Sequence, residues 1–566
     1  MHSLPPGAIL MLGAPLLPFL LEGAAARLPA PADPELRAPA PSASAARDSS
    51  LELFGQTLVP IRIDRLALVW GHVFHIAAML GALYALRVDD RVQQTAAPIY
   101  AGSAIAAAFA GDLLTLFVYW ELTAVSSVFL VWAGRSLFGE RSLRAGMRYL
   151  IIQVTSGVLL LAGAVMHVAD SGSLAFDHLG LVSPGTTLIF LAFGMKACFP
   201  LLHNWLQDAY PESTPSGTVF LSAFSTKLAI YALARGFAGT ECLIWIGAIM
   251  TAFPIFFAVI ENDLRRVLAY SLNNQLGFMV VGIGVGTELA LNGTAAHAFA
   301  HILYKGLLFM SMGAVLMRTG TIKASELGGL HKSMPWTTVF CIVGALSISA
   351  MPLFSGFTTK SMIITAVGDH HLLWVFLVLV FASAGVVDHS GIKVPFFTFF
   401  AHDSGRRVKE APLEMLIAMG ITAALCVAIG IFPAPLYRIL PYDIEYHAYT
   451  GGHVVGQLQL LFFAAMAFAI LFRSGLYPPE VRSRNLDSDW LYRKLAPAML
   501  RPVVAGCGAI DGAWRSARAA VATRGGALIA RVCGPRGFLG GAWTTGGAVV
   551  WISVVLLGFL LAYYRH

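Results

Sequence analysis

Long, almost uninterrupted apolar runs constrain this sequence more than any other feature. A transmembrane helix needs about 20 mostly apolar residues, and about fifteen runs qualify. Closed β-barrels would instead require alternating strands of about ten residues, and these runs do not alternate. The sequence therefore predicts an all-α polytopic membrane protein with about fifteen transmembrane helices. The runs lie near 5–22, 63–86, 95–111, 113–134, 147–168, 184–203, 215–237, 240–261, 265–288, 289–317, 337–365, 370–400, 412–433, 453–473 and 545–563.

Composition excludes the common soluble classes. Hydrophobic residues make up 57% of the 566 positions and charged residues only 12%, whereas soluble domains carry about a quarter of charged residues. A soluble chain could not bury that much apolar surface, so a cytosolic enzyme and a disordered protein are both excluded. The six cysteines are scattered without a C-x-x-C pair. They predict neither a zinc site, an iron–sulfur ligand set nor a disulfide framework.

Charge in the loops predicts the orientation. The segments 135–148, 261–266, 318–336 and 402–410 carry Arg or Lys, whereas those near 169–183, 286–293 and 366–371 carry none. Because basic loops stay in the cytoplasm, this alternation assigns the first group to the cytoplasmic face.

Two stretches do not read as spans. Residues 23–50 are rich in Ala and Pro and predict a flexible external loop; a signal peptide over the first run is the alternative. Residues 474–543 hold ten Arg or Lys against four Asp or Glu. They predict an interfacial helix over anionic lipid, or else a basic, poorly ordered cytoplasmic loop.

Charged side chains inside the apolar runs are the candidate functional residues. Each costs about 2.5–3.5 kcal/mol on insertion, so a scaffold has no reason to keep them, whereas a proton path does. Buried histidines add groups that titrate near neutral pH. The primary candidates are Glu121, Lys196, Lys227, His297, His301, Lys305 and Lys360; the secondary ones are His203, Asp388 and Lys393.

Two of these lysines stand beside weak points in their helices. Lys196 precedes Pro200 by four residues, and Lys360 follows Pro352 and Gly356. Proline removes a helical hydrogen bond, and helices broken within a membrane mark ion sites in transporters. The Lys196 span is expected to run inward and the Lys360 span outward, which predicts two half-units related by inversion.

Spacing groups three further residues. His297, His301 and Lys305 recur at every fourth position, so they share one helix face along which a proton could pass. Histidines that are only hydrogen-bonded inside the bundle are the alternative; zinc is disfavoured because no carboxylate or Cys partner lies nearby. Glu121 needs a cationic partner, whose charged form it would favour. It acts either as an electrostatic gate or as a fixed ion pair.

Six sequence runs in order carry a family resemblance. GDLLTLFVYWELTAVSS, GMKACFPLLHNWLQDAYPE, SGTVFLSAFSTKLAIYALAR, DLRRVLAYSLNNQLGFM, HAFAHILYKGLLFMSMG and MPLFSGFTTK resemble the antiporter-like subunits of respiratory complex I. They are more similar still to the D component of the Mrp-type multi-subunit sodium/proton antiporters. The likeness spans about 95–435.

The resemblance implies two inverted five-helix units, each with a broken helix, around a hydrated proton half-channel. It matches Glu121 to the family's glutamate, Lys196 and Lys227 to the lysines of the broken helix and the next one, and Lys360 to the terminal lysine. The stripe from His297 to Lys305 fits the central polar axis. The family opens with two helices before IRIDRLALVW where this chain has one span. Beyond residue 435, this chain resembles the complex I subunit whose lateral helix clamps a neighbouring membrane subunit.

The resemblance therefore divides the chain into six segments. They are 1–94 (N-terminal spans and the Ala/Pro-rich loop), 95–237 (the first antiporter-like half), 238–400 (the second antiporter-like half), 401–473 (C-terminal spans), 474–543 (the basic cytoplasmic or interfacial segment) and 544–566 (the last span).

The expected function is proton translocation within a bacterial cytoplasmic-membrane complex, driving cation (sodium)/proton antiport together with other membrane subunits. No cofactor or nucleic-acid partner is expected, since the chain carries no flavin, nucleotide or cluster motif. The rivals are a proton-pumping module of a complex I-like or hydrogenase assembly, a partner in inorganic-carbon uptake, and a non-conducting structural subunit.

Overall fold

The computed structural model describes residues 49–53, 55–481, 485, 487–541 and 543–565. The chain divides into two compact units, one ending at Asn485 and the other beginning at Leu486. The run expected near 5–22 and most of the Ala/Pro-rich loop lie outside the described residues. The basic segment 474–543 is divided between the two units.

The first unit opens with a small antiparallel hairpin of two strands, β1 (Ser49–Leu53) and β2 (Gln56–Ile61). The end of the segment expected to be a loop thus forms β1. The helices of the first half follow, and acidic or hydroxyl residues cap several of them: the carboxylates of Asp64, Asp90 and Asp112 accept backbone N–H groups at the starts of α3, α4 and α5. The elements are α3 (Arg65–Tyr84), α4 (Arg91–Ala108), α5 (Leu113–Trp132), α6 (Arg135–Phe138), α7 (Glu140–Ser171), α8 (Pro184–Lys196), α9 (Asn204–Ala209), α10 (Pro215–Ala223) and α11 (Ser225–Gly236).

The second half and the spans after it complete this unit. The remaining elements are α12 (Cys242–Ile260), α13 (Leu264–Val285), α14 (Glu288–Thr319), η1 (Ala324–Glu326), η2 (Leu330–Lys332), α15 (Pro335–Ile348), α16 (Ser355–Asp369), α17 (Leu373–Val386), η3 (Val387–Lys393), η4 (Phe396–Phe400), α18 (Leu413–Ile431), α19 (Ala434–Arg438) and α20 (Gly451–Arg473).

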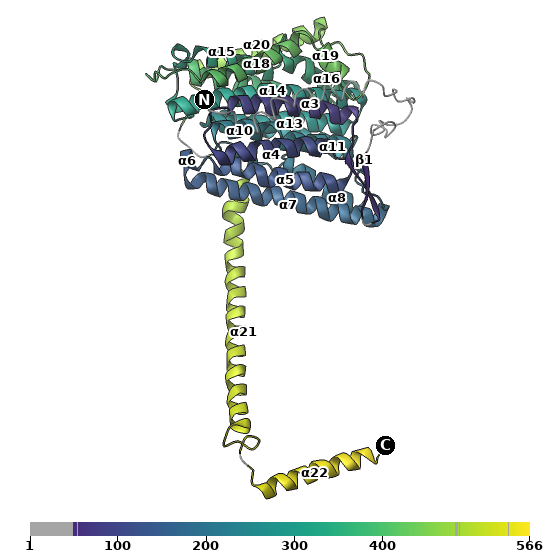
Figure 1. The fold of residues 1–566 in the computed structure, drawn as a ribbon. Coiled ribbons are helices and arrows are strands. Elements are labelled where there is room, and N and C mark those ends of the chain that lie inside the picture. The colour runs from purple at the N-terminus through teal and green to yellow at the C-terminus, as the bar shows by residue number, and fades with distance from the viewer. Residues whose placement is uncertain (1–48, 54, 482–484, 486, 542, 566) are drawn as a thin grey trace, which may run out of the picture. The chain divides into compact units, whose positions relative to one another are not determined.

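The helix α14 forms the core of the first unit. It contacts α3, α10, α13, α15, α16 and α18, and its apolar stretch is wholly buried. Figure 1 shows α3 and α14 running through the middle of the bundle, with α5 and α7 towards one side and α15, α18 and α20 towards the other. The polar residues within the apolar stretch of α14, such as His297, His301 and Lys305, are therefore shielded from lipid.

In the described part of the chain, ten helical stretches are long and apolar enough to cross a membrane. The other expected spans after the first form shorter or more polar helices: α4 and α13 carry internal Gln or Asn, and the runs 184–203 and 337–365 are each divided by a break. The described residues are thus all-α apart from the hairpin, as the sequence predicts.

The two broken runs share one backbone conformation. Cys198 and Leu201 flank Pro200 with φ of 65° and 70°, and Ala350 and Leu353 flank Pro352 with φ of 55° and 76°.

The hydrogen bonds of the two breaks also match residue for residue. The amide of Phe199 donates to the carbonyl of Gly194 at 3.0 Å, as Met351 does to Leu346 at 3.0 Å. This match supports the predicted internal repeat. It also shows that the lysines of the two breaks are not equivalent, because Lys196 ends the helix before its break whereas Lys360 lies in the helix after the other one.

Gly356 lies in the first turn of α16 rather than in the break itself. A side-chain Cβ there would overlap the carbonyl oxygen of Ser347. The glycine therefore lets α16 start directly against the end of α15.

The second unit is helical, with elements η5 (Leu491–Leu495), α21 (Ala496–Cys533) and α22 (Thr545–Tyr563). The 38-residue α21 is exposed along its length within this unit, so most of the basic segment is a long helix rather than a poorly ordered loop. Its Arg515 pairs with Asp511 one turn earlier, at 2.8 Å.

Candidate functional site

Glu121 and Lys196 lie on neighbouring helices of the first half. Glu121 projects from α5 towards Gly157 of α7, and its Oε1 is buried without a hydrogen-bond partner. Lys196 is wholly buried; its Nζ donates to the carbonyl of Trp120 at 2.7 Å and to Thr123 Oγ1 at 3.1 Å. The two charges interact electrostatically, yet no ion pair joins these two described residues.

Lys227 stands where the run 215–237 is interrupted between α10 and α11. The backbone of Phe224 (φ −104°, ψ −71°) departs from helical geometry there. The Nζ of Lys227 turns back to the carbonyl of Ser222 at 2.6 Å. The break thus supplies a backbone acceptor to a wholly buried ammonium group.

The two histidines of α14 are wholly buried and their ring centroids lie 6.2 Å apart. His297 has a partner on each ring nitrogen: Thr359 Oγ1 at 3.2 Å from Nδ1, and Gln275 Oε1 at 3.2 Å from Nε2. Both ring nitrogens of His301 lack a hydrogen-bond partner. Among the described residues, His301 is therefore the member of the pair whose ring nitrogens are not committed to a neighbouring group.

Lysines of both halves act electrostatically on His301. The charges of Lys227, Lys305 and Lys360 all act on it electrostatically. These lysines come from α11, α14 and α16, so the site joins the first half to the second.

Lys305 begins a branch of the polar network. Its Nζ donates to Ser271 Oγ at 2.9 Å and to the carbonyl of Leu268 at 3.3 Å. Ser390 Oγ donates to the same Ser271 Oγ at 2.7 Å. The branch therefore runs from α14 across α13 to η3.

Lys360 reaches a cavity of about 610 Å³ between α16, α17 and α20. Its Nζ lies 3.4 Å from the carbonyl of Ile348 and 4.8 Å from the centre of the Phe278 ring. Asp369 and His453 also line the cavity. The cavity thus connects a buried ammonium group to polar residues near the ends of α16 and α20.

Four of the predicted lysines share one chemical feature. Each is bonded to neutral carbonyl or hydroxyl oxygens, and none forms an ion pair within the described residues. A lysine held in this way can lose and regain its proton without leaving a buried carboxylate uncompensated. The four are Lys196, Lys227, Lys305 and Lys360.

The secondary candidates are not part of this row of four buried lysines (Lys196, Lys227, Lys305 and Lys360). His203 lies in the first break with its ring 4.6 Å from that of Phe253. Lys393, in contrast, is firmly paired: its Nζ lies 2.8 Å from Glu480 Oε1 and donates to the carbonyls of Val259 and Glu261 at 2.6 and 2.8 Å. Those carbonyls end α12, where a cation is favoured. Asp388 lies in η3, one turn before Lys393.

Several polar residues of the network are not predicted from the sequence. Single Gln, Ser and Tyr residues within apolar helices give no local signal, since each is common in an ordinary core. A cue existed only for His389, which follows the candidate Asp388 directly and is wholly buried. These additional members are Ser271, Gln275, Tyr304, Thr359, His389 and Ser390.

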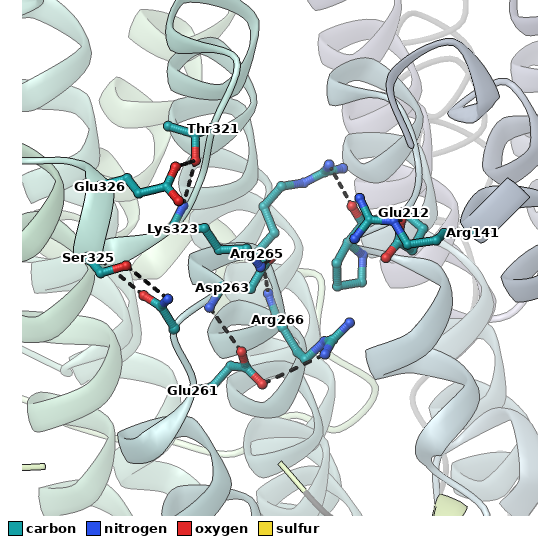
Figure 2. Close-up of polar contacts among 12 residues, drawn as sticks. Arg141, Glu212, Glu261, Asp263, Arg265, Arg266, Thr321, Lys323, Ser325 and Glu326 are labelled. Atoms are coloured by element: carbon teal, nitrogen blue, oxygen red, sulfur yellow. Dashed lines mark hydrogen bonds and ion pairs between the residues drawn. The ribbon is translucent and has the colours of Figure 1, made fainter. Parts of the chain in front are cut away.

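A separate charged cluster fastens the two halves on the side of the basic loops (Figure 2). Arg265 starts α13 and donates to the carbonyls of Pro211, Ser213 and Thr214, at 3.1, 2.9 and 3.1 Å. Lys323 pairs with Asp263 at 2.8 Å. The cluster connects fixed charges to backbone groups, which is typical of a structural clasp.

The pKa of Asp263 in this cluster lies below its usual value. Burial opposes the charged carboxylate, but the charges of Lys323 and Arg266 outweigh that effect. The carboxylate also accepts the backbone N–H groups of Arg265 and Arg266, which caps α13.

Known proteins share both sequence similarity and architecture with this chain. Residues 110–385 match the family model described as NADH:quinone oxidoreductase/Mrp antiporter, TM. Hydrogenase-4 component B of Escherichia coli is 28% identical over 66% of this chain and 62% of that protein. The D component of the Na(+)/H(+) antiporter of Alkalihalophilus pseudofirmus is 30% identical over 45% of this chain and 55% of its own length. The chain thus spans about 60% of the length of these curated relatives.

Solved structures agree on the fold. A chain of the archaeal membrane-bound sulfane sulfur reductase matches with a TM-score of 0.67 at 20% identity, covering 98% of this chain and 95% of its own. A chain of the Mrp complex from Dietzia matches with a TM-score of 0.62 at 20% identity, covering 72% and 86%. The chain is therefore a multi-pass membrane protein whose residues 110–385 are similar to the antiporter-like family shared by NADH:quinone oxidoreductases and Mrp antiporters.

Proposed function

We propose that this chain is a proton-translocating subunit of a multi-subunit cation/proton antiporter in a bacterial cytoplasmic membrane. The observation that carries the proposal is the row of buried lysines bonded to neutral oxygens, with His301 at its centre. An inert membrane scaffold would gain nothing from burying unpaired cations, since each costs free energy. The names of the Na(+)/H(+) antiporter relatives support antiport.

The proposed path begins near Lys196 and passes Lys227. Protons then reach His301 on α14 and continue to Lys360, with His297 and Lys305 on the same stripe. The cavity beside Lys360 gives the path contact with water, and Asp369 and His453 at its wall provide groups that can accept a proton. By the positive-inside rule, this end faces away from the cytoplasm.

Glu121 acts in this proposal as an electrostatic gate on the first lysine. Its carboxylate favours the charged form of Lys196 without a direct ion pair. Protonation or displacement of Glu121 then releases the proton of Lys196 towards Lys227.

The partners follow from this role. Protons are the transported species, sodium is the candidate counter-ion, and other membrane subunits complete the complex. The arginines of α21 suit a surface of anionic lipid. Any redox centre would lie in another subunit, so the chain itself acts as a transporter subunit rather than an enzyme.

A second candidate function is a proton-pumping module that redox chemistry elsewhere in its complex would drive. The similarity to hydrogenase-4 component B favours it, because that match covers more of this chain than the match to the antiporter D component. Purification of the intact complex separates the two candidates: small antiporter subunits support antiport, whereas co-purified quinone- or hydrogenase-type subunits support the pump.

The test of the path uses Lys227→Ala in the assembled complex, with proton-coupled transport measured in inverted membrane vesicles. The variant removes the link between the halves, so transport should fall to background while the amount of complex is unchanged. Lys409→Ala, at an exposed loop lysine, is the matched control and should transport normally. Because each turnover in this proposal needs a proton delivered through Lys227, full transport by Lys227→Ala at normal expression would overturn the path and support a non-conducting structural role.

A further inference from the structure

A second cavity lies on the side of the basic loops, beside the segment that follows α20. Its volume is about 300 Å³, and its lining includes Ser325, His402, Tyr477 and Glu480. Ser325 and His402 belong to loops that the positive-inside rule assigns to the cytoplasm. The cavity therefore meets the cytoplasmic side of the second half, far along the chain from Lys196.

Glu480 forms the inner wall of this cavity. Its side chain is only 7% exposed, and Oε1 contacts the buried Lys393 at 2.8 Å. Because Lys393 is also held by two carbonyl groups of α12, its charge is fixed. The other carboxylate oxygen, Oε2, is buried without a hydrogen-bond partner.

That environment suits a group which gains and loses protons. Burial raises the pKa of Glu480 from its ordinary value, and the nearby Lys393 opposes this effect. The carboxyl group thus combines an unpartnered oxygen with contact to a cavity.

Three consecutive residues of η3 lead inward from Glu480. Asp388 has a buried Oδ1 without a partner and interacts electrostatically with Glu480. His389 is wholly buried and its Nε2 has no hydrogen-bond partner. Ser390 is already bonded to Ser271, which accepts from Lys305. The π-helical η3 therefore carries a carboxyl group, an imidazole ring and a hydroxyl group in consecutive positions, and the hydroxyl group is bonded to the partner of Lys305.

We infer that Glu480, Asp388 and His389 form a second proton entrance, which joins the cytoplasmic side directly to Lys305. This inference rests on the proposed function. A proton from water in the cavity binds Glu480, passes to Asp388 and His389, and reaches the amine of Lys305 through the two serines. Lys393 holds Glu480 in position and carries no proton itself.

The experiment compares Glu480→Gln and Asp388→Asn with wild type in the intact complex, with proton-coupled transport measured in vesicles. Gln keeps an oxygen for Lys393, so the fold should persist while proton exchange stops. Transport should fall roughly tenfold or more, as for loss of a positioned proton carrier, because each turnover in this proposal needs a proton at Lys305 as well as the one delivered through Lys227. The double variant should be no slower than the slower single variant, because both groups serve one route. Glu445→Gln, at an exposed acid on the other side, should behave as wild type.

The outcomes separate this inference from the proposed function. If Lys227→Ala abolishes transport while Asp388→Asn and Glu480→Gln transport at the wild-type rate, the second entrance is wrong and the path through the first half stands. If Lys227→Ala transports normally as well, the proposed function itself fails. If Glu480→Gln lowers the thermal unfolding temperature, Asp388→Asn, which leaves the Lys393 contact intact, decides the question: its unchanged rate overturns the entrance.

Discussion

The carboxylate of Glu121 lies so close to Gly157 that a methyl group on the glycine would overlap Oε1. Glycine is thus required on α7 for the acid on α5 to hold its position. Since Glu121 makes no ion pair among the described residues, this packing, rather than a salt link, fixes where its charge acts on Lys196. The alternative reading of Glu121 as half of a fixed ion pair loses its support.

Gly157→Ala should therefore disturb the gate without removing the acid. The methyl group displaces the carboxylate, weakens its action on Lys196, and disfavours the protonated lysine. The alkaline limb of the pH–transport profile should move to lower pH, as it should in Glu121→Gln, where the charge is absent. Transport by purified complex in vesicles of varied pH gives the measurement.

The control for this substitution is Gly102→Ala, in a helix where an added Cβ meets no atom within 4 Å. It should keep the wild-type profile. An unchanged profile in both Gly157→Ala and Glu121→Gln would mean that Glu121 does not control the first lysine.

The helix breaks yield a second prediction, because Leu201 and Leu353 occupy the left-handed region of φ. A β-branched residue tolerates that region far less well than leucine does. Leu201→Ile and Leu353→Ile should each lower the free energy of unfolding by about 1 kcal/mol, whereas Leu→Gly at the same sites should cost less. Thermal unfolding in detergent measures the difference.

Leu191→Ile provides the matched control, since Leu191 is a partly exposed residue within α8. Its unfolding temperature should change little. Equal effects of Ile at Leu191, Leu201 and Leu353 would contradict the shared left-handed conformation at the two breaks.

Sequence reasoning identified the ionisable residues but not their partners. A charge inside an apolar run is conspicuous by itself, which is why the sequence alone is enough to name Lys196, Lys227, Lys305 and Lys360. Their acceptors are backbone carbonyls and hydroxyl groups on other helices, and no local pattern marks them. For example, Lys393 resembles the other lysines in sequence, but its partner Glu480 lies 87 residues further along the chain, beyond the reach of any spacing rule.

The internal repeat is likewise predictable from the sequence only in part. Proline interrupts a helix and is visible in the sequence, so Pro200 and Pro352 indicate the positions of both helix breaks. The equivalence of the two breaks depends on the backbone path, which aligns Cys198 with Ala350. In that alignment Lys196 lies before its break and Lys360 lies after the other one. Pairing Lys196 with Lys360 as equivalent residues would therefore have been misleading.

The clasp in Figure 2 yields a third prediction, which concerns pH. The pKa of Asp263 is lowered in the folded chain from its ordinary value of 3.8. A carboxyl group whose pKa is lowered by folding stabilises the protein above its unfolded-state pKa, and loses that contribution as the pH falls through the folded-state value. The ion pair with Lys323 should therefore contribute fully at neutral pH and fade in acid.

Asp263→Asn separates the charge from the helix cap, because Asn can still accept the backbone N–H groups that begin α13. At neutral pH the free energy of unfolding of the variant should be lower by about 1 kcal/mol, because Lys323 is partly exposed. Its unfolding temperature should fall accordingly. As the pH falls below the ordinary value of 3.8 and through the lowered folded-state pKa of Asp263, this gap should close, since the wild-type carboxylate becomes neutral as well. Asp90→Asn, which caps α4 through Val92 without an ion pair in the described chain, should show little change at either pH. A gap for Asp263→Asn that persists undiminished in acid would mean that packing at the clasp, and not the charge of Asp263, stabilises the start of α13.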